Sequence, residues 1–298
     1  MTNYQARPAT AESFRLSEGP LWDAPRNRVL WVDIEGRAVL EGSLAGDLVL
    51  VTARHEFDTR VGAVVPAADG RLLVAAQEQL LVVQPNGDRT PGPRFVTSGV
   101  DSRANDGSVD PAGRFLIGTL ALDEREKQES LYRVEDDGSL TTIDDDLTLS
   151  NGLAWSPDGA VFYSTDTTSK TIYSRSYDKA TGDVGERRVH LTLDSGSPDG
   201  LCCDADGTLW VAVFGEGEIR HFGTDGALLD TVTVPAPNTT SVAFIGPNLD
   251  TLLITTGRDN LSPEELAEYP DSGKLFTARV GATGQYSTPW SGSWAADA

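Results

Sequence analysis

The feature that most constrains this chain is a turn followed by an apolar strand, repeated roughly every 41 to 48 residues. In each copy the turn is rich in Asp, Pro and Gly, and one more apolar run precedes it. The copies are DAPRNRVLWVD (23–33), AADGRLLVAA (67–76), DPAGRFLIGT (110–119), SPDGAVFYST (156–165), DADGTLWVAV (204–213) and GPNLDTLLITT (246–256). A regular period of several short strands is typical of propellers. We therefore predict an all-β fold, a six-bladed β-propeller with four-stranded blades.

The repeat extends over nearly the whole chain, so we expect a single propeller domain over residues 1–298. Its core is expected at about 12–282, with a C-terminal tail at 283–298. We expect the segment ESFRL (12–16) to complete the last blade. A short helix is expected at SPEELAEY (262–269), in a loop of that blade.

Composition narrows the range of partners. The formal net charge of −21 argues against nucleic acid and against an anionic membrane surface as partners. No segment approaches the roughly 18 apolar residues that a membrane helix requires. We therefore expect a small-molecule ligand, no nucleic acid and no membrane partner, with the protein a monomer or a weak homo-oligomer.

The cysteines and the N-terminal sequence predict the cellular compartment of the protein. Cys202 and Cys203 are adjacent and are the two cysteines of the chain. Neighbouring cysteines rarely form a disulfide and do not make a metal site by themselves, so buried thiols in a reducing environment are expected. The first residues, MTNYQARPATAESF, contain no apolar core of a secretory signal. We predict a cytoplasmic location.

The repeat also aligns polar residues that lie far apart in the sequence. We align the copies on the turn glycine and take the residue eight positions before it, or the equivalent residue where the turn differs. These residues all occupy the same register on the innermost strands of the blades. These residues are Glu18, Gly62, Asn105, Asn151, Asp199 and Thr240. Because the first strand of each propeller blade lines the central channel, these residues should form a ring at one mouth of it.

The ring has the composition of a cation site. Its two carboxylates would repel each other unless a positive charge lay between them, and carboxylate and amide oxygens suit a hard cation. We predict one divalent metal ion held by Glu18, Asn151 and Asp199. Calcium is the expected ion; magnesium, manganese, zinc or iron(II) are alternatives. The competing interpretation is that each Asn or Asp before glycine only caps a turn.

Other polar groups complete the prediction around the ring. Arg103 lies two positions before Asn105, where its guanidinium can reach over the channel mouth toward a hydroxyl-rich ligand or an acidic neighbour. The three histidines, His55, His190 and His221, are expected to be structural. The chain has no G-x-S-x-G motif, which disfavours a serine nucleophile of the α/β-hydrolase type.

Four segments carry a resemblance to a known family. SEGPLWD, RANDGSVDPAGRFLIGT, LSNGLAWSPDG and SPDGLCCDADGTLWVA resemble, in order and spacing, motifs of the regucalcin/gluconolactonase family, which includes senescence marker protein and sugar lactonases. The similarity extends over roughly residues 14–280. It implies a six-bladed propeller with one divalent metal at the channel mouth, and the family's metal ligands match Glu18, Asn151 and Asp199.

The resemblance also implies a substrate and its contacts. The family's substrate-binding Arg and Asn match Arg103 and Asn105, and a further acidic contact, often Glu, falls at Asp123. We expect hydrolysis of a sugar aldonolactone of the gluconolactone, xylonolactone or arabinonolactone type to the aldonic acid. In this hypothesis the metal polarises the carbonyl, Asp199 is both ligand and general base, and Arg103 and Asn105 orient the sugar.

Two alternatives remain open at this stage. One is another hydrolase on the same scaffold, either a metal-dependent phosphotriesterase or a lactonase for acyl-homoserine or aromatic lactones. The other is a non-catalytic propeller that binds calcium. Polar residues at the channel mouth favour a sugar, whereas an apolar rim would favour the other hydrolases.

Overall fold

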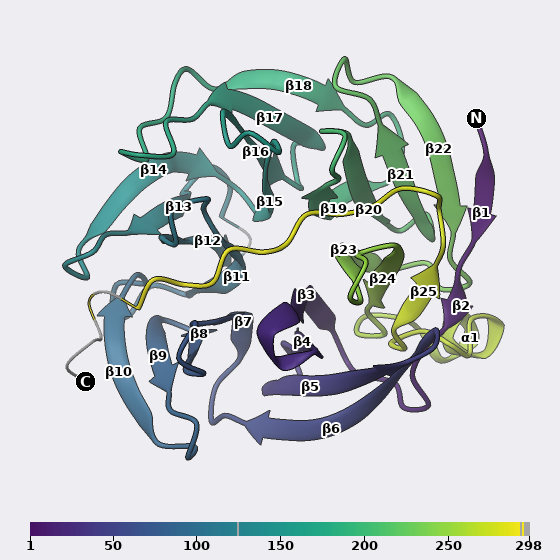
Figure 1. Ribbon diagram of the computed structural model, residues 1–298, viewed down its shortest axis with the longest axis horizontal. Coiled ribbons are helices and arrows are strands. Elements are labelled where there is room, and N and C mark those ends of the chain that lie inside the picture. Colours follow the sequence, from purple (N-terminus) through teal and green to yellow (C-terminus); the bar gives the residue numbers. More distant parts are fainter. Residues whose placement is uncertain (124, 293, 295–298) are drawn as a thin grey trace.

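The computed structural model describes residues 1–123, 125–292 and 294. The chain forms a closed ring of six β-sheets around a central channel (Figure 1), which confirms the predicted six-bladed propeller with four-stranded blades. Consecutive sheets follow one another in the sequence, and each runs from an innermost strand outward. The channel is therefore lined by the first strand of every blade, as the repeat predicts.

The blades have the following strands, listed from the innermost outward. Blade 1 has β3 (Ser17–Asp23), β4 (Arg28–Asp33), β5 (Ala38–Ala45) and β6 (Leu48–Glu56), with a short 3₁₀ turn, η1 (Ala24–Arg26), before β4. Blade 2 has β7 (Val61–Pro66), β8 (Leu72–Ala76), β9 (Gln79–Val83) and β10 (Arg89–Arg94); blade 3 has β11 (Ser102–Val109), β12 (Phe115–Ala121), β13 (Glu129–Val134) and β14 (Leu140–Leu147). Blade 4 has β15 (Ser150–Trp155), β16 (Val161–Asp166), β17 (Thr171–Ser176) and β18 (Arg188–Thr192). Blade 5 has β19 (Ser197–Cys203), β20 (Leu209–Phe214), β21 (Glu218–Phe222) and β22 (Leu228–Thr233); blade 6 has β23 (Thr239–Ile245), β24 (Thr251–Thr256), β25 (Phe276–Ala278) and β2 (Arg7–Pro8).

The repeated turn connects the first and second strands of a blade. In blade 3 the Asp110 carboxylate accepts hydrogen bonds from the backbone N–H groups of Ala112 and Arg114, at 2.8 and 2.9 Å. Gly113 has a φ of 95°, in the left-handed region that favours glycine. The Asp-x-x-Gly spacing, found here and at 204–207, therefore reflects the geometry of this turn.

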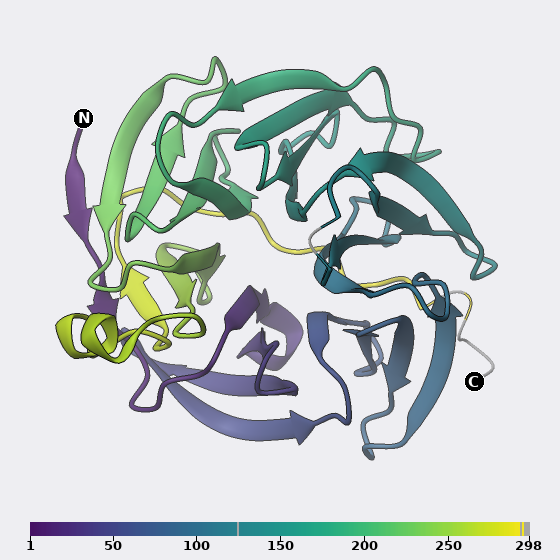
Figure 2. The same cartoon turned by 180° about the vertical axis from the view of Figure 1, so that it is seen from behind.

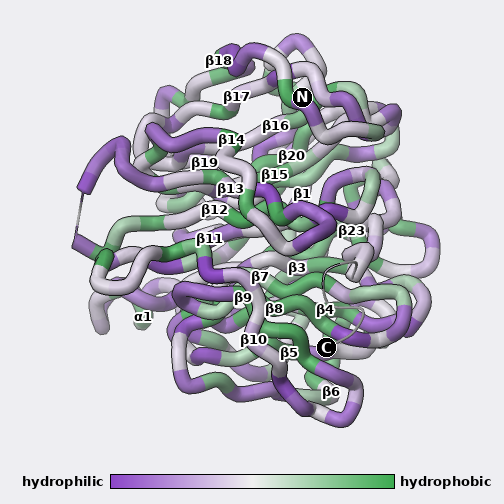
Figure 3. Tube along the Cα trace, turned by 90° about the vertical axis from the view of Figure 1, so that its left-hand side faces the viewer, coloured by the Kyte–Doolittle hydropathy of each residue, from purple (hydrophilic) through white to green (hydrophobic). Residues whose placement is uncertain are grey.

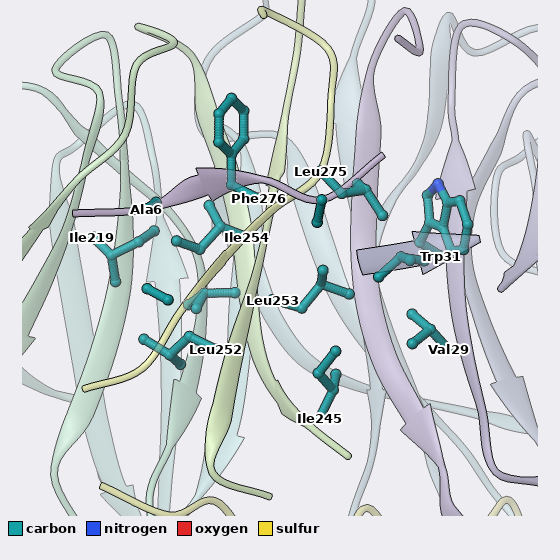
Figure 4. Close-up of a cluster of buried hydrophobic side chains, with 14 of the residues drawn as sticks. Ala6, Val29, Trp31, Ile219, Ile245, Leu252, Leu253, Ile254, Leu275 and Phe276 are labelled. Atoms are coloured by element: carbon teal, nitrogen blue, oxygen red, sulfur yellow. The ribbon is translucent and has the colours of Figure 1, made fainter. Parts of the chain in front are cut away.

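Apolar side chains from neighbouring blades pack against each other and form the core. One cluster joins blades 1, 5 and 6, and includes Trp31, Ile219 and Phe276 (Figure 4). Trp155 lies in another cluster, between blades 3 and 4, where its ring stacks on Phe162 with centroids 4.8 Å apart. The hydropathy-coloured trace shows the same division, with apolar strands inside and hydrophilic loops at the periphery (Figure 3).

The N-terminal segment closes the ring, but through different residues than expected. The fourth strand of blade 6 is β2, in which Arg7 pairs with Thr277 of β25. The expectation that residues 12–16 would complete this blade is therefore wrong. That segment instead lies across the end of the blade, where Leu16 forms an isolated bridge with Gly257. Farther toward the N-terminus, β1 (Asn3–Gln5) adds a fifth strand to blade 5, parallel to β22.

The expected short helix in the last blade is present as α1 (Pro263–Glu268), between β24 and β25. Ser262 caps it: its hydroxyl accepts a hydrogen bond from the Glu265 backbone, and the Glu265 carboxylate accepts one from the Ser262 N–H. Among the described residues, no helix has the length and apolar character needed to cross a lipid bilayer.

The C-terminal tail crosses one face of the propeller (Figure 1), and Figure 2 shows the opposite face. The tail forms hydrogen bonds with several blades on its way. The backbone N–H of Gly284 donates to Leu249, and that of Trp290 donates to Pro66, at 2.8 and 2.9 Å. Because Pro66 ends β7, the tail lies at the end of the channel where the innermost strands finish.

The tail should contribute to the stability of the ring. The Trp290 side chain is 2% exposed and packs with the core between blades 2 and 3. Trp290→Ala should lower the free energy of unfolding by about 3–5 kcal/mol, the usual loss for a buried aromatic side chain. Urea unfolding measures the loss, and Tyr286→Ala, at a tail residue that is 63% exposed, is the control. A midpoint of Trp290→Ala equal to that of the wild type would show that this part of the tail does not brace the propeller.

Candidate metal and substrate site

Every innermost strand has an irregularity at the ring position or directly after it. The pairing of the first strand with the second shifts register between Glu18 and Leu21, Val61 and Ala63, Ala104 and Gly107, Asn151 and Leu153, Pro198 and Leu201, and Thr239 and Ser241. Such a bulge takes a residue out of the regular alternation of the strand and re-aims its side chain. The bulges explain how polar side chains come to lie near the axis of an otherwise apolar fold.

Two of the six ring residues, Gly62 and Thr240, contribute to the packing between blades. A Cβ added at Gly62 would lie 2.3 Å from the backbone oxygen of Asn105, so only glycine allows β7 and β11 to approach this closely. Thr240 is fully buried, and its hydroxyl donates to the carbonyl of Ser17 at 2.6 Å. Thr240 thereby ties blade 6 to blade 1.

The carboxylates of the ring lie close enough to influence one another. Burial raises the pKa of Glu18 well above its usual value, and repulsion from Asp199 and Asp106 raises it further. Burial, with repulsion from Asp106, likewise raises the pKa of Asp199. Negative charge is therefore concentrated here in a poorly solvated place, which a bound cation would stabilise.

Two oxygen atoms in the ring have no partner among the described residues. Asn151 is 3% exposed and Asp199 is 7% exposed, and the Oδ1 atom of each is buried without a hydrogen bond. Burying an unsatisfied polar atom is costly, so such atoms point to a ligand that supplies the missing interaction. Together with the Glu18 carboxylate, these oxygens form a donor set that fits a hard divalent cation.

The donor set differs from a cluster of acidic or histidine ligands. Within the described residues, no three His, Cys, Asp or Glu side chains come together in a group that could hold a metal. The predicted set contains only two carboxylates, and its third donor is the Asn151 amide. The histidines lie on the third or outermost strands of their blades. His221, for example, stacks on Trp210 with ring centroids 3.9 Å apart.

Arg103 and Asn105 are positioned together beside the carboxylates. The Arg103 guanidinium donates to the Asn105 side-chain oxygen at 2.7 Å, and the Asn105 amide donates to the Ser150 carbonyl at 2.9 Å. Burial lowers the pKa of Arg103 to about 10, while Glu18 and Asp199 among other acidic groups favour its charged form. Arg103 therefore remains a cation at neutral pH.

Asp123 lies in the loop after β12, at the same end of blade 3 as the start of β11. Its carboxylate accepts a hydrogen bond from Arg125 at 2.6 Å, which holds the pKa of Asp123 below its usual value. Arg125 also donates to the Ser102 hydroxyl at 2.8 Å. A substrate contact at Asp123 stays a prediction, and it would require the carboxylate to exchange or share its bond to Arg125.

Asp106 was not among the residues chosen from the sequence. It follows Asn105 inside the bulge of β11, and burial raises its pKa to about 6. It also lines a cavity of about 520 Å³ that runs along the channel, away from Arg103, toward Gln285 and Tyr286 of the tail. The sequence signal was the Asn-Asp-Gly triplet, whose second residue falls one position outside the register used to find the ring.

The charge on Asp106 should make the stability of the metal-free protein depend on pH. A raised pKa means that the folded protein keeps a proton that the unfolded chain, with an Asp pKa of about 3.9, has released. The contribution of Asp106 to stability therefore falls as pH rises from about 4 through 6. Asp106→Asn should raise the melting temperature of metal-free protein more at pH 8 than at pH 4.5.

Thermal unfolding by circular dichroism at the two pH values measures this effect. Glu56→Gln removes an equal charge at an exposed position on β6 and is the matched control. A stabilisation by Asp106→Asn that is the same at both pH values would contradict the expected titration.

Comparison with known proteins identifies the family. A family model described as "SMP-30/Gluconolactonase/LRE-like region" matches residues 16–258. The chain belongs to this family. The match confirms the resemblance found in the sequence motifs, and it spans all the residues of the predicted site.

Relatives of the SMP-30/gluconolactonase family match over nearly their whole length. The pentonolactonase XacC of Haloferax volcanii is 34% identical over 291 residues, covering 92% of this chain and 94% of the relative. The regucalcin of Danio rerio is 33% identical over 281 residues, covering 93% and 94%. In the crystal structure of a calcium-binding regucalcin from Agrobacterium tumefaciens, 28% identical, the fold matches with a TM-score of 0.91 over 97% of this chain and 98% of that one.

Proposed function

We propose that this protein is a metal-dependent sugar lactonase that opens an aldonolactone to the aldonic acid. The observation that carries the proposal is the pair of buried, unpartnered oxygens on Asn151 and Asp199, in a carboxylate-rich ring close to Arg103. Membership of a family that includes a pentonolactonase supports the reaction class. The hydroxyl-rich substrate is favoured by the polar side chains at the ring.

Glu18, Asn151 and Asp199 would hold the cation, with calcium the expected ion. A divalent cation there supplies positive charge that polarises a carbonyl oxygen and makes a nearby water easier to deprotonate. Calcium binding by the regucalcin from Agrobacterium tumefaciens supports this choice of ion. Magnesium, manganese, zinc and iron(II) are the other ions to be compared.

The protein's own groups would supply the remaining chemistry. Asp199 accepts the proton of the attacking water, because its carboxylate is buried in the ring and has a second oxygen besides the Oδ1 atom assigned to the cation. Arg103 donates hydrogen bonds to the lactone and stays charged while it does so. Asn105 is fixed by its bond to Ser150 and orients a sugar hydroxyl. Asp123 at the rim would contact a further hydroxyl.

The two cysteines support a proposal for the location of the enzyme. Cys202 and Cys203 are free thiols, and burial raises the pKa of both, which keeps them protonated and unreactive. We place the enzyme in the cytoplasm, where free thiols persist. We also expect it to act as a monomer or weak homo-oligomer.

The decisive assay measures acid release from D-glucono-δ-lactone, D-xylonolactone and L-arabinonolactone with a pH indicator. Metal-stripped protein is tested alone and after addition of each divalent ion, with spontaneous hydrolysis subtracted. Restoration of turnover by a metal supports the lactonase, and the ranking of the sugars names the substrate. Calcium binding without turnover on any lactone would instead support a binding propeller or another hydrolase.

Asp199→Asn tests the assigned roles. The amide keeps the shape of the side chain but cannot accept the proton of water, so kcat should fall by about 100-fold or more. Circular dichroism should show the fold unchanged. The control is Asp194→Asn, at an exposed position before β19. Full activity in Asp199→Asn would exclude Asp199 as the general base.

A further inference from the structure

Thr167 contacts two parts of the ring at once. It follows β16 in the turn that leads to β17. Its hydroxyl accepts a hydrogen bond from the Asn151 side-chain amide at 3.0 Å and donates one to the Pro198 carbonyl at 2.8 Å. Asn151 belongs to blade 4, whereas Pro198 belongs to blade 5 and immediately precedes Asp199. One hydroxyl therefore links the strands that carry two of the proposed metal donors.

The direction of these two bonds is determined by chemistry. The Pro198 carbonyl can only accept, so the single hydroxyl proton of Thr167 is committed to it. The hydroxyl oxygen then presents only lone pairs to Asn151, and the group facing it must be the amide NH₂. The amide oxygen of Asn151 is consequently turned away from Thr167 and left for another partner.

That oxygen is the buried Oδ1 atom that has no described hydrogen-bond partner. An asparagine amide can flip by 180°, and the flipped form would offer an NH₂ group to a cation. The bond to Thr167 excludes the flipped form, because NH₂ cannot remain bonded to the hydroxyl after the flip. Thr167 thus selects the orientation of Asn151 that can bind a metal.

The backbone before each of the three proposed donors is held in a similar way. The Thr240 hydroxyl bonds the Ser17 carbonyl before Glu18, and the Asn105 amide bonds the Ser150 carbonyl before Asn151. The Thr167 hydroxyl bonds the Pro198 carbonyl before Asp199. In each case a side chain of the preceding blade fixes the strand that presents the donor. Thr167 alone among these three side chains also bonds a proposed donor's side chain.

We propose that Thr167 is a positioning residue of the metal site, which orients the Asn151 amide oxygen and fixes the strand that carries Asp199. This inference rests on the proposed function, because it requires that Asn151 and Asp199 bind a metal. Partners of metal-binding side chains outside the coordination sphere commonly change metal affinity by about 10- to 100-fold. Thr167 should have an effect of that size without touching the ion.

The experiment compares calcium binding to metal-stripped full-length variants by isothermal titration calorimetry. Thr167→Val preserves the shape of the side chain but removes both hydrogen bonds, and should weaken calcium binding by about 10- to 100-fold. Thr167→Ser restores the hydroxyl and should bind calcium nearly as the wild type does. Thr168→Val, at the exposed neighbouring residue, is the matched control and should leave binding unchanged. Thermal unfolding of each metal-free variant reports its fold, and Thr167→Ala replaces the valine variant if that one does not fold.

The outcomes separate this inference from the proposed function. Weak binding in Thr167→Val, rescued in Thr167→Ser, supports the positioning role. Wild-type calcium affinity in Thr167→Val together with lost binding in Asn151→Ala would overturn the role of Thr167 and leave the metal site standing. A lower melting temperature with unchanged affinity would show that the residue is only structural. If wild-type protein binds none of calcium, magnesium, manganese, zinc and iron(II), both this inference and the metal-dependent function are wrong.

Discussion

The candidate site depends on the bulge that interrupts each innermost strand at the same height. A regular strand alternates its side chains between two faces, and in a propeller both faces of a blade pack against neighbouring blades. A polar side chain in that alternation would therefore be buried between sheets. The bulge interrupts this alternation at the ring position or directly after it, and close approaches such as that of Gly62 to Asn105 bring the strands together around the axis.

This arrangement has an energetic consequence for the rest of the molecule. Glu18, Asp106 and Asp199 repel one another in a poorly hydrated place, so the metal-free ring opposes folding whenever they are ionised. The apolar packing between blades must outweigh that repulsion, and pairing of β2 with β25 and the crossing tail keep the ring closed. A bound cation would convert the repulsion into attraction and stabilise the folded state.

The sequence predicted the structural features that repeat from blade to blade. Turn chemistry and period predicted the number of blades, and the register before each turn glycine selected Glu18, Asn151 and Asp199. It could not reveal features that occur once. The two-residue β2 has no alternation to recognise, and the tail crosses a face without forming a regular strand. Asp106 was not predicted, because counting positions along a strand assumes regular pairing and a bulge adds a residue. Thr167 resembles any other turn residue in the sequence, and its role becomes visible only when its partners on two blades are known.

The bonds between blades suggest why such a site can be precise although its donors lie far apart in sequence. Each strand that carries a proposed donor is held by a side chain from the preceding blade, so its position depends on a neighbour and not only on its own sheet. Because the ring is closed, a displacement of one blade must be absorbed by all the others, and individual blades cannot drift independently. The pairing of β2 with β25, at the periphery of the molecule, therefore helps to fix the geometry of the ring at its centre. The same closure that makes the fold stable also restricts the distances between Glu18, Asn151 and Asp199, which is the preorganisation that a metal site requires.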